Sequence, residues 1–342
     1  MLNPEFQKQG LPKSVVADIE KLCKGILKGD ISALSKGITL VESARPSDQE
    51  RKSALIEKLF LHSGKSYRLG ITGVPGVGKS TFIEALGLLA IEKGFRPAVL
   101  SIDPSSARSG GSILGDKTRM NDLSKHPSAY VRPSASGLHL GGVARSTRES
   151  MVLCEAAGYD LIIVETVGVG QSEIEALQLT DFFLLLMLSG AGDELQGIKR
   201  GIMETADGII ITKADGENIE PSKRAAQEYR RALHLMPPHQ GEWIPKVHTA
   251  SSLEGHGIDT ALSWMQQYKD LCTTNGYWTE KRAKQAVYWF QQNIQQQILG
   301  LLRQNNDLKQ LLDAYREDVA NLEKDPFQAV DDVVRRININ VG

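Results

Sequence analysis

The chain has 342 residues, of which 41% are hydrophobic, and this length suits one large α/β domain with helical additions or two modest domains. Its 40 Lys and Arg residues are matched by 41 Asp and Glu residues, which leaves a formal net charge of −1. A balanced charge gives no overall attraction to nucleic acid or to an anionic membrane, so a helicase or another nucleic-acid motor is disfavoured.

The cysteine, histidine and apolar patterns favour a soluble cytoplasmic protein without a structural metal. The three cysteines lie far apart, and the seven histidines include no i, i+4 pair, so neither a disulfide framework nor a metal-binding helix is indicated. The amino terminus lacks the apolar run of a signal peptide and the Arg-rich pattern of a transit peptide. The longest strongly apolar segment, 182–188, is far too short to span a membrane.

Taken from the amino terminus, residues 14–62 indicate helices, because apolar residues such as Ile19, Leu22 and Ile26 recur at helical spacing. We expect a helical extension over residues 1–64. From residue 65 the pattern changes to short β-branched runs that alternate with longer amphipathic stretches, which is typical of a parallel sheet covered by helices. These runs predict strands at 68–72, 98–102, 161–164, 182–188, 208–212 and 246–249.

The predicted fold is an α/β P-loop NTPase domain over residues 65–273, with a mostly parallel central sheet flanked by helices. Each predicted strand ends at a loop with polar or glycine residues, at the carboxyl edge where open α/β folds bind ligands. Residues 274–342 indicate a C-terminal helical extension. Its apolar stripe is expected to pack against its own domain, with dimerisation as the alternative, and consists of Val287, Phe290, Ile294, Ile298 and Leu301.

Between the first strand and an amphipathic helix lies a complete Gly-x-x-x-x-Gly-Lys-Ser motif in the strand–loop–helix context that the motif requires. The glycines let backbone N–H groups turn toward a phosphate, and the positive end of the following helix adds to the attraction. Lys79 is expected to bridge the β- and γ-phosphates, and Ser80 to offer its hydroxyl to Mg²⁺. The predicted nucleotide-binding residues here are Gly73, Val74, Pro75, Gly76, Val77, Gly78, Lys79, Ser80 and Thr81.

Acidic residues at later strand ends are candidates for the metal site and the switch. Glu165 stands three residues before Gly168, as in the acidic-x-x-Gly arrangement of switch GTPases, so it would orient Mg²⁺ while the Gly168 N–H contacts the γ-phosphate. Asp103 and Asp116 are further Mg²⁺-linked candidates, although a carboxylate such as Asp103 can instead cap a helix. Gln171 is a candidate for orienting the attacking water, with a solvated loop glutamine as the alternative.

The segment Thr212-Lys213-Ala214-Asp215 follows a predicted strand, resembles the [Asn/Thr]-Lys-x-Asp element of G-proteins, and predicts guanine as the base. An aspartate can accept hydrogen bonds from both N1–H and the exocyclic amine of guanine, whereas adenine presents no such donor pair. The alternative is an exposed turn pair of little energetic weight. A backbone N–H for guanine O6 is expected after the next strand, at Ser251, Ser252 and Leu253.

Longer segments closely resemble the MeaB-type G-protein chaperones of adenosylcobalamin-dependent acyl-CoA mutases, which are also labelled as lysine/arginine/ornithine transport-system kinases. The resemblance covers most of the chain and is carried by residues 73–80, 103–106, 110–120, 165–173 and 192–199. It implies a homodimeric GTPase of low intrinsic activity, which a mutase stimulates and which gates delivery and exchange of the cobalamin. No tightly held organic cofactor is expected, because adenosylcobalamin would belong to the partner.

The same resemblance implies site residues. Asp103, Asp116 and Glu165 would be the Mg²⁺ and switch carboxylates, and Lys199 would belong to an additional switch that couples the nucleotide state to the partner. His139 stays open between a switch element and a structural histidine. Without the resemblance, the segment 192–199 would be interpreted as a Gly-rich strand-to-helix turn.

The sequence is compatible to different degrees with three functions. The leading hypothesis is a GTP-dependent chaperone whose switch is read by a mutase. The second is an ATP-dependent kinase of an amino-acid transport system, which would require ATP preference and phosphate transfer to a protein side chain; the Thr-Lys-x-Asp element disfavours it. A metal-insertion GTPase is the third, and the scattered His and Cys residues give it no support.

Overall fold

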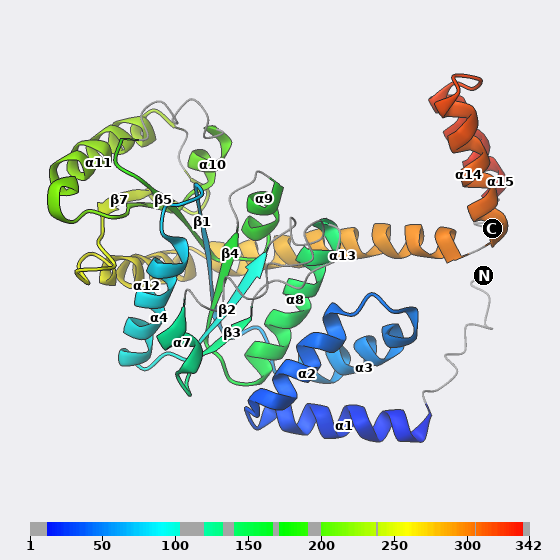
Figure 1. Ribbon diagram of the computed structural model, residues 1–342, viewed down its shortest axis with the longest axis horizontal. Coiled ribbons are helices and arrows are strands. Elements are labelled where there is room, and N and C mark those ends of the chain that lie inside the picture. The colour runs from blue at the N-terminus through cyan, green and yellow to red at the C-terminus, as the bar shows by residue number, and fades with distance from the viewer. Residues whose placement is uncertain are drawn as a thin grey trace. The chain divides into compact units, whose positions relative to one another are not determined.

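The computed structural model describes residues 12–102, 120–132, 140–166, 171–190, 200–236, 239–304 and 306–337. Within these residues, seven parallel strands form one sheet in the compact unit Leu11–Ala283, and helices lie on both of its faces (Figure 1). The strands are β1 Tyr67–Gly73, β2 Pro97–Ile102, β3 Tyr130–Arg132, β4 Leu161–Thr166, β5 Phe182–Met187, β6 Gly208–Ile211 and β7 Lys246–Thr249. Their order is β3-β2-β4-β1-β5-β6-β7.

Strand β1 lies in the middle of the sheet, where Leu69 pairs with Ile163 of β4 on one side and with Phe182 of β5 on the other. Every residue of β4 and β5 is buried, because helices cover both faces of the sheet, and this explains their continuous apolar sequences. Since all the strands are parallel, their carboxyl ends share one edge. The loops after β1, β6 and β7 and the carboxyl end of β4 therefore lie at the same edge of the sheet.

The two faces of the sheet have separate hydrophobic cores. On one face, α4 (Lys79–Glu92), α7 (Asn121–Lys125) and α12 (Asp259–Thr274) pack against β1, β4 and β5. On the other, α10 (Arg200–Thr205) and α11 (Ile219–His234) pack against β5, β6 and β7, while α8 (Leu140–Ala156) and α9 (Gln171–Leu177) contact β4. A short 3-10 turn, Gly216–Asn218, precedes α11. The predicted α/β fold is confirmed.

The predicted N-terminal helices are α1 (Lys13–Leu27), α2 (Ile31–Glu42) and α3 (Gln49–Phe60), with a 3-10 turn at Pro46–Asp48. Asp30 caps α2 by accepting hydrogen bonds from the backbone N–H groups of Ser32 at 2.8 Å and Ala33 at 3.1 Å. Helices α2 and α3 pack against α8. Helices α2 and α8 lie so close together at Gly37 that a Cβ there would be 2.8 Å from a methyl carbon of Leu153. This contact explains why a glycine stands inside α2.

The predicted C-terminal helices are α13 (Tyr277–Gln304), α14 (Asn306–Ala320) and α15 (Pro326–Ile337), and from Lys284 onward they belong to a second compact unit. The apolar stripe does lie on α13, where Val287 is 56% exposed and Phe290 65% exposed. What packs against this stripe, its own domain or a second copy of the chain, stays a prediction. Spacing alone identifies an apolar face and not what covers it. No helix in the described ranges is long and apolar enough to cross a membrane.

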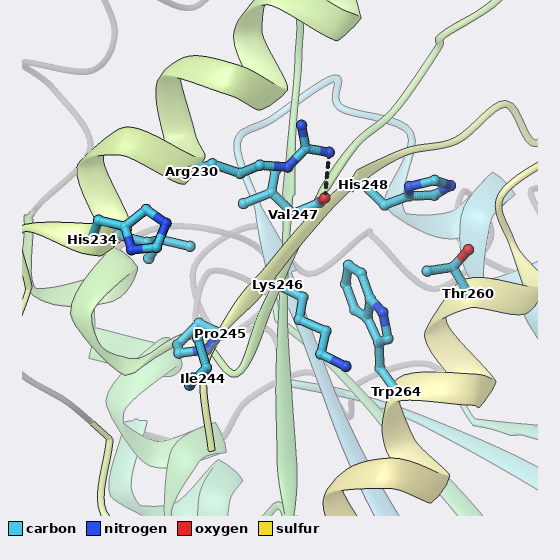
Figure 2. Close-up of a pocket in the computed structure, with 10 residues that line it drawn as sticks. Arg230, His234, Ile244, Pro245, Lys246, Val247, His248, Thr260 and Trp264 are labelled. Carbon is cyan, nitrogen blue, oxygen red and sulfur yellow. Dashed lines mark hydrogen bonds between the residues drawn. The ribbon is translucent and has the colours of Figure 1, made fainter. Parts of the chain in front are cut away.

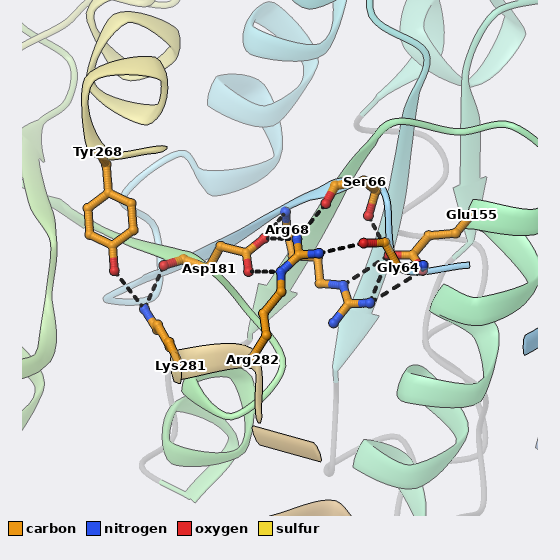
Figure 3. Close-up of polar contacts among 8 residues, drawn as sticks. All are labelled: Gly64, Ser66, Arg68, Glu155, Asp181, Tyr268, Lys281 and Arg282. Atoms are coloured by element: carbon orange, nitrogen blue, oxygen red, sulfur yellow. Dashed lines mark hydrogen bonds and ion pairs between the residues drawn. The ribbon is translucent and has the colours of Figure 1, made fainter. Parts of the chain in front are cut away.

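The second turn of α13 is bound to the amino ends of β1 and β5 by a cluster of charged side chains (Figure 3). Arg282 forms a two-pronged pair with the buried Asp181, with N···O distances of 2.8 and 2.7 Å, and donates to the carbonyl oxygens of Gly64 and Ser66 at 2.6 Å each. Lys281 donates to the Asp181 carbonyl oxygen at 2.5 Å. This cluster fixes the end of the sheet opposite to the phosphate loop.

The six predicted strands are all present, and strand β3 was missed. It has only three residues, Tyr130–Arg132, too few for a period-2 pattern to stand out from its surroundings. The limits proposed for the N-terminal extension, the central domain and the C-terminal extension stay a prediction.

Candidate functional site

The loop between β1 and α4 has the conformation of a phosphate cradle. Gly76 and Gly78 have φ angles of 79° and 92°, in the left-handed region that side chains with a Cβ rarely adopt, so these two positions favour glycine. Val77 between them is fully buried and anchors the loop in the core, and its N–H donates to the Val74 carbonyl oxygen at 3.3 Å. Helix α4 starts directly after Gly78, so its positive end faces the loop.

The Lys79 side chain lies across this loop. Its Nζ donates to the carbonyl oxygens of Gly73 at 2.8 Å and Val74 at 3.3 Å. Burial lowers the pKa of Lys79, and the negative charges of Glu165 and Glu173 oppose that shift. The site thus holds one partly buried ammonium group against the loop backbone, where it can pair with phosphate oxygens.

A hydroxyl and a carboxylate meet next to the loop. Glu165 lies near the end of β4, in register with Ile71 of β1 and Ser101 of β2, and its Oε1 accepts a hydrogen bond from the Ser80 hydroxyl at 3.3 Å. Hard oxygen ligands of this kind, completed by water and phosphate, are what Mg²⁺ prefers, so the pair fits the implied metal ion. Among the described residues there is no group of three or more His, Cys, Asp or Glu side chains that could hold a metal.

The loop after β6 is tied directly to the phosphate loop. The buried Thr212 hydroxyl lies 2.7 Å from the Val77 carbonyl oxygen and 3.2 Å from that of Met187. The aliphatic stem of Lys213 also reaches the loop, because a Cβ at Gly78 would lie 3.9 Å from its Cε. Lys213 has a φ of 55°, and the adjacent Ala214 N–H is held by the Ala250 carbonyl oxygen at 3.1 Å.

A carboxylate is held in place beside this loop. Asp215 accepts a hydrogen bond from the Ser251 hydroxyl at 2.5 Å, and the same hydroxyl accepts one from the Glu254 N–H at 3.1 Å. The Ser251 N–H in turn donates to the His256 carbonyl oxygen at 3.0 Å, which closes the turn after β7. The two predicted base elements are therefore joined, and an oriented, partly exposed carboxylate of this kind can accept two N–H groups of a ligand.

Several predicted site residues lie outside the described residues: Asp103, Asp116, Gly168, Lys199 and the open case His139. Gln171 is the first residue of α9, and the structure describes its backbone but not its side chain. Of the other predicted residues, Ser252 is partly exposed and Leu253 is 83% exposed, in the turn after Ser251. Their assignment to nucleotide contacts stays a prediction.

Sequence reasoning missed Glu173. This α9 residue is buried, with 2% exposure, and its charge acts on the ammonium group of Lys79. It stood in the segment 165–173 that carried the family resemblance, but neither its spacing nor its type assigned it a role. A buried carboxylate near the phosphate-loop lysine depends on how α9 packs, which a single sequence does not show.

A second carboxyl of α9 makes the stability of the protein dependent on pH. Burial raises the pKa of the half-buried Glu175 from 4.5 to about 7, and within the described residues its Oε2 has no hydrogen-bond partner. The folded chain binds this proton more tightly than the unfolded chain, so the carboxyl lowers stability as pH rises through this interval. We expect Glu175→Gln to increase the free energy of unfolding at pH 8 by about 1 kcal/mol, a value reduced for solvent screening.

The same substitution should leave stability nearly unchanged at pH 4, where both states of the wild-type chain carry the proton. Urea unfolding at the two pH values measures the difference. Glu57→Gln on α3, the same exchange at an exposed glutamate, is a suitable control. An equal change at both pH values for Glu175→Gln would show that its effect is not due to titration.

Known proteins are similar to this chain over most of its length. A family model described as methylmalonyl-CoA mutase-associated GTPase MeaB matches residues 34–307. A probable GTPase, Rv1496, of Mycobacterium tuberculosis is 44% identical over 94% of this chain and 96% of its own length. The mouse protein named methylmalonic aciduria type A homolog, mitochondrial, is 40% identical over 94% of this chain and 80% of its own length.

Among solved structures, the crystal structure of a protein named LAO/AO transport system kinase is similar, with a TM-score of 0.74 and 36% sequence identity. The match covers 94% of this chain and 98% of that chain. The similarity thus extends well beyond the phosphate loop.

Proposed function

This chain belongs to the MeaB family of methylmalonyl-CoA mutase-associated GTPases, and on that premise we propose that it is a GTP-hydrolysing chaperone of an adenosylcobalamin-dependent acyl-CoA mutase. Its nucleotide state would gate the loading, protection or exchange of adenosylcobalamin on that mutase. The family match over residues 34–307 is the observation that carries the proposal, and the name of the mouse relative, which refers to methylmalonic aciduria, supports it. The proposed location is cytoplasmic.

In the proposed GTP site, residues 73–81 hold the phosphates and the Lys79 ammonium pairs with the β- and γ-phosphate oxygens. The hydrogen bonds of Lys79 to two loop carbonyl oxygens support this role, because they place its charge where the phosphates would enter. Since phosphoryl transfer relies on positioning and charge stabilisation, the fixed loop and its single ammonium would supply much of the catalysis.

For the metal site we propose Ser80 and Glu165, with Asp103 and Asp116 as further members of the Mg²⁺ and switch set. When bound, Mg²⁺ supplies positive charge that offsets the negative charge of the phosphate oxygens. The hydrogen bond of 3.3 Å between Ser80 and Glu165 supports the first two assignments. Switch roles for Gly168, Gln171 and Lys199 complete the proposal and depend on the family.

For the base, we propose that Asp215 accepts hydrogen bonds from the N1–H and the exocyclic amine of guanine. The stem of Lys213 would pack against the base on the side that faces the phosphate loop. The Asp215–Ser251 hydrogen bond supports this, because it fixes the carboxylate before a ligand arrives and so lowers the cost of ordering on binding. The Thr212 hydroxyl supports it as well, since it joins this loop to Val77 of the phosphate loop. The segment Ser251 to Leu253 would bind guanine O6.

Mixing the protein with an adenosylcobalamin-dependent methylmalonyl-CoA mutase tests the chaperone role. We expect the rate of GTP hydrolysis, measured as phosphate release, to rise when the mutase is added. We also expect the two proteins to co-elute in a nucleotide-dependent manner. The Lys79→Ala chain is the matched control, because it should report any hydrolysis that contaminates the mutase. Absence of both binding and stimulation, with GDP and with a non-hydrolysable GTP analogue, would leave a GTPase without this partner.

A second candidate function is an ATP-dependent kinase of an amino-acid transport system, which the name of the similar crystallised protein favours. That function requires ATP preference and transfer of phosphate to a protein side chain. Direct competition between GTP and ATP separates the two candidates, since the Asp215 carboxylate is suited to guanine and has no matching donor pair on adenine. Tighter binding of ATP would favour the kinase.

We further propose that the protein is a homodimer, and the exposed apolar stripe of α13 supports this. Phe290 is 65% exposed and Ile294 43% exposed, and a second copy of the chain would remove such surface from water. We expect Phe290→Asp to shift the mass in solution from dimer to monomer at micromolar concentration, because a charge buried at an interface without a partner is strongly unfavourable. Light scattering measures the mass.

Gln291→Asp introduces the same charge one position further along α13, at a residue that is already polar and exposed, and should leave the mass unchanged. A wild-type chain that is monomeric at high concentration would refute the dimer. A dimer that survives Phe290→Asp would exclude the stripe from the interface.

A further inference from the structure

A pocket of about 440 Å³ lies along the outer edge of the sheet (Figure 2). Strands β5 and β6 separate this edge from β1 and the phosphate loop. Strand β7 is the edge strand, and α11 and α12 cover opposite faces of the sheet. Both helices contribute to the pocket, with Arg230 and His234 from α11 and Thr260 and Trp264 from α12. Its volume falls in the range of ligand pockets, about 300–1,000 Å³.

The charged side chains that line this pocket are all basic: Arg230, Lys246 and the two histidines His234 and His248. The pKa of His248 is lowered, mainly by burial and to a smaller extent by the charge of Arg230. The charge of Asp259 partly offsets this shift. The permanent positive charges are therefore those of Arg230 and Lys246. A pocket with two such cations and no carboxylate among the described residues that line it attracts an anion.

The rest of the lining is apolar. Of the apolar lining residues, Trp264 is 7% exposed and Val247 6% exposed, whereas Ile244 is 73% exposed. Leu233 and Pro245 complete the apolar surface. An exposed large apolar side chain beside a buried ring is suited to a ligand with a body the size of a ring, and not only to an inorganic anion.

The hydrogen bonding of β7 argues against a peptide strand as the occupant. Parallel strand addition would need the outward carbonyl and N–H groups of the edge strand. The Val247 carbonyl oxygen already accepts a hydrogen bond from Arg230 Nη2 at 2.9 Å, so the guanidinium covers the edge (Figure 2). An arginine has five N–H donors, and those not facing Val247 can serve a ligand anion.

Lys246 is held in a position from which its ammonium group can bind an anion in the pocket. Its Nζ lies 4.8 Å from the centroid of the Trp243 ring and donates to Gln267 Oε1, which fixes the ammonium near the pocket without neutralising it. We propose that the pocket at the β7 edge binds a small organic anion that carries an apolar body of about one ring. This site is independent of the mutase role and lies outside the nucleotide site.

Phenyl phosphate, benzoate and inorganic phosphate are the probes, titrated by calorimetry into the full chain saturated with GDP and Mg²⁺ so that the phosphate loop is occupied. We expect one saturable site for phenyl phosphate, with an affinity at least about 10-fold higher than that of inorganic phosphate, because the ring adds buried apolar area. The comparison of phenyl phosphate with benzoate shows whether the anion is a phosphate or a carboxylate.

Arg230→Met and Lys246→Met should each weaken phenyl phosphate binding by about 10-fold or more, since each removes a charge-assisted contact. Arg224→Met removes an exposed cation from the same helix outside the pocket and should change nothing. Lys246→Met keeps the test valid if Arg230→Met disturbs the strand edge, because Lys246 donates to no backbone carbonyl in the described structure.

Four results of these titrations would overturn the proposal. They are the absence of saturable binding at 10 mM probe (on the order of the weakest affinities of interest), equal affinity for inorganic phosphate, equal binding by the Met variants and the wild type, and displacement of the probe by further GDP. Binding of an extended acidic peptide that phenyl phosphate does not displace would also overturn it, in favour of strand addition.

Discussion

Replacing Lys79 with alanine is expected to lower GTP turnover by about 100-fold or more, because in the proposed site this ammonium pairs with the transferred phosphoryl group. In the structure this ammonium lies across the loop, bound to the carbonyl oxygens of Gly73 and Val74. A charge fixed in this way needs little reorganisation when charge develops in the transition state. A phosphate-release assay at saturating GTP measures the loss.

The fold should survive the same substitution. Burial lowers the pKa of Lys79, which means that the folded protein holds its charge at a cost, so its removal should change the free energy of unfolding by no more than about 1 kcal/mol. Lys93→Ala, at the exposed end of the same helix, is the control for charge removal and should keep full turnover. Wild-type turnover by Lys79→Ala would refute the assignment of the phosphate loop as the catalytic site.

The parts of the site that were predictable from sequence are local in the chain. The phosphate loop needs a strand, two glycines with positive φ and a helix start within about ten residues, and the pattern of residues 68–80 contains all of them. Strands such as Phe182–Met187 were predictable because burial on both faces requires a continuous apolar run. In both cases the physical requirement acts on neighbouring residues.

The contacts that join these parts were not predictable. The Thr212 hydroxyl bonds to Val77, 135 residues earlier, and Ser251 bonds to Asp215 across 36 residues. Thr212 occupies the first position of the base element, and its buried hydroxyl lies within hydrogen-bond distance of two carbonyl oxygens. Contacts of this kind follow from strand order, which the single sequence left undetermined.

The exposed apolar stripe of α13 is a second case in which the sequence pattern was not sufficient for prediction. Its spacing predicted an apolar face, and the face exists on α13, but spacing does not show what packs against Val287 or Phe290. Burial is a property of the assembly as well as of the fold. The basic pocket along β7 likewise combines two helices and an edge strand that no sequence motif connects.

Replacing Arg282 with methionine is expected to lower the free energy of unfolding by about 3–5 kcal/mol, because it leaves the charge of Asp181 buried without its partner. Asp181 is 1% exposed, and Arg282 supplies two of its hydrogen bonds, at 2.8 and 2.7 Å (Figure 3). The guanidinium also bonds the carbonyl oxygens of Gly64 and Ser66, which precede β1. Methionine keeps most of the stem and removes every one of these donors.

The double variant Arg282→Met with Asp181→Asn distinguishes a lost pair from lost packing. The amide has no charge to leave uncompensated, so the double variant should be more stable than Arg282→Met alone, as a double-mutant cycle by urea unfolding would show. Arg316→Met, at a largely exposed arginine of α14, should change stability by less than about 0.5 kcal/mol. A loss below about 1 kcal/mol for Arg282→Met would mean that packing alone holds the start of α13 to the amino end of β1.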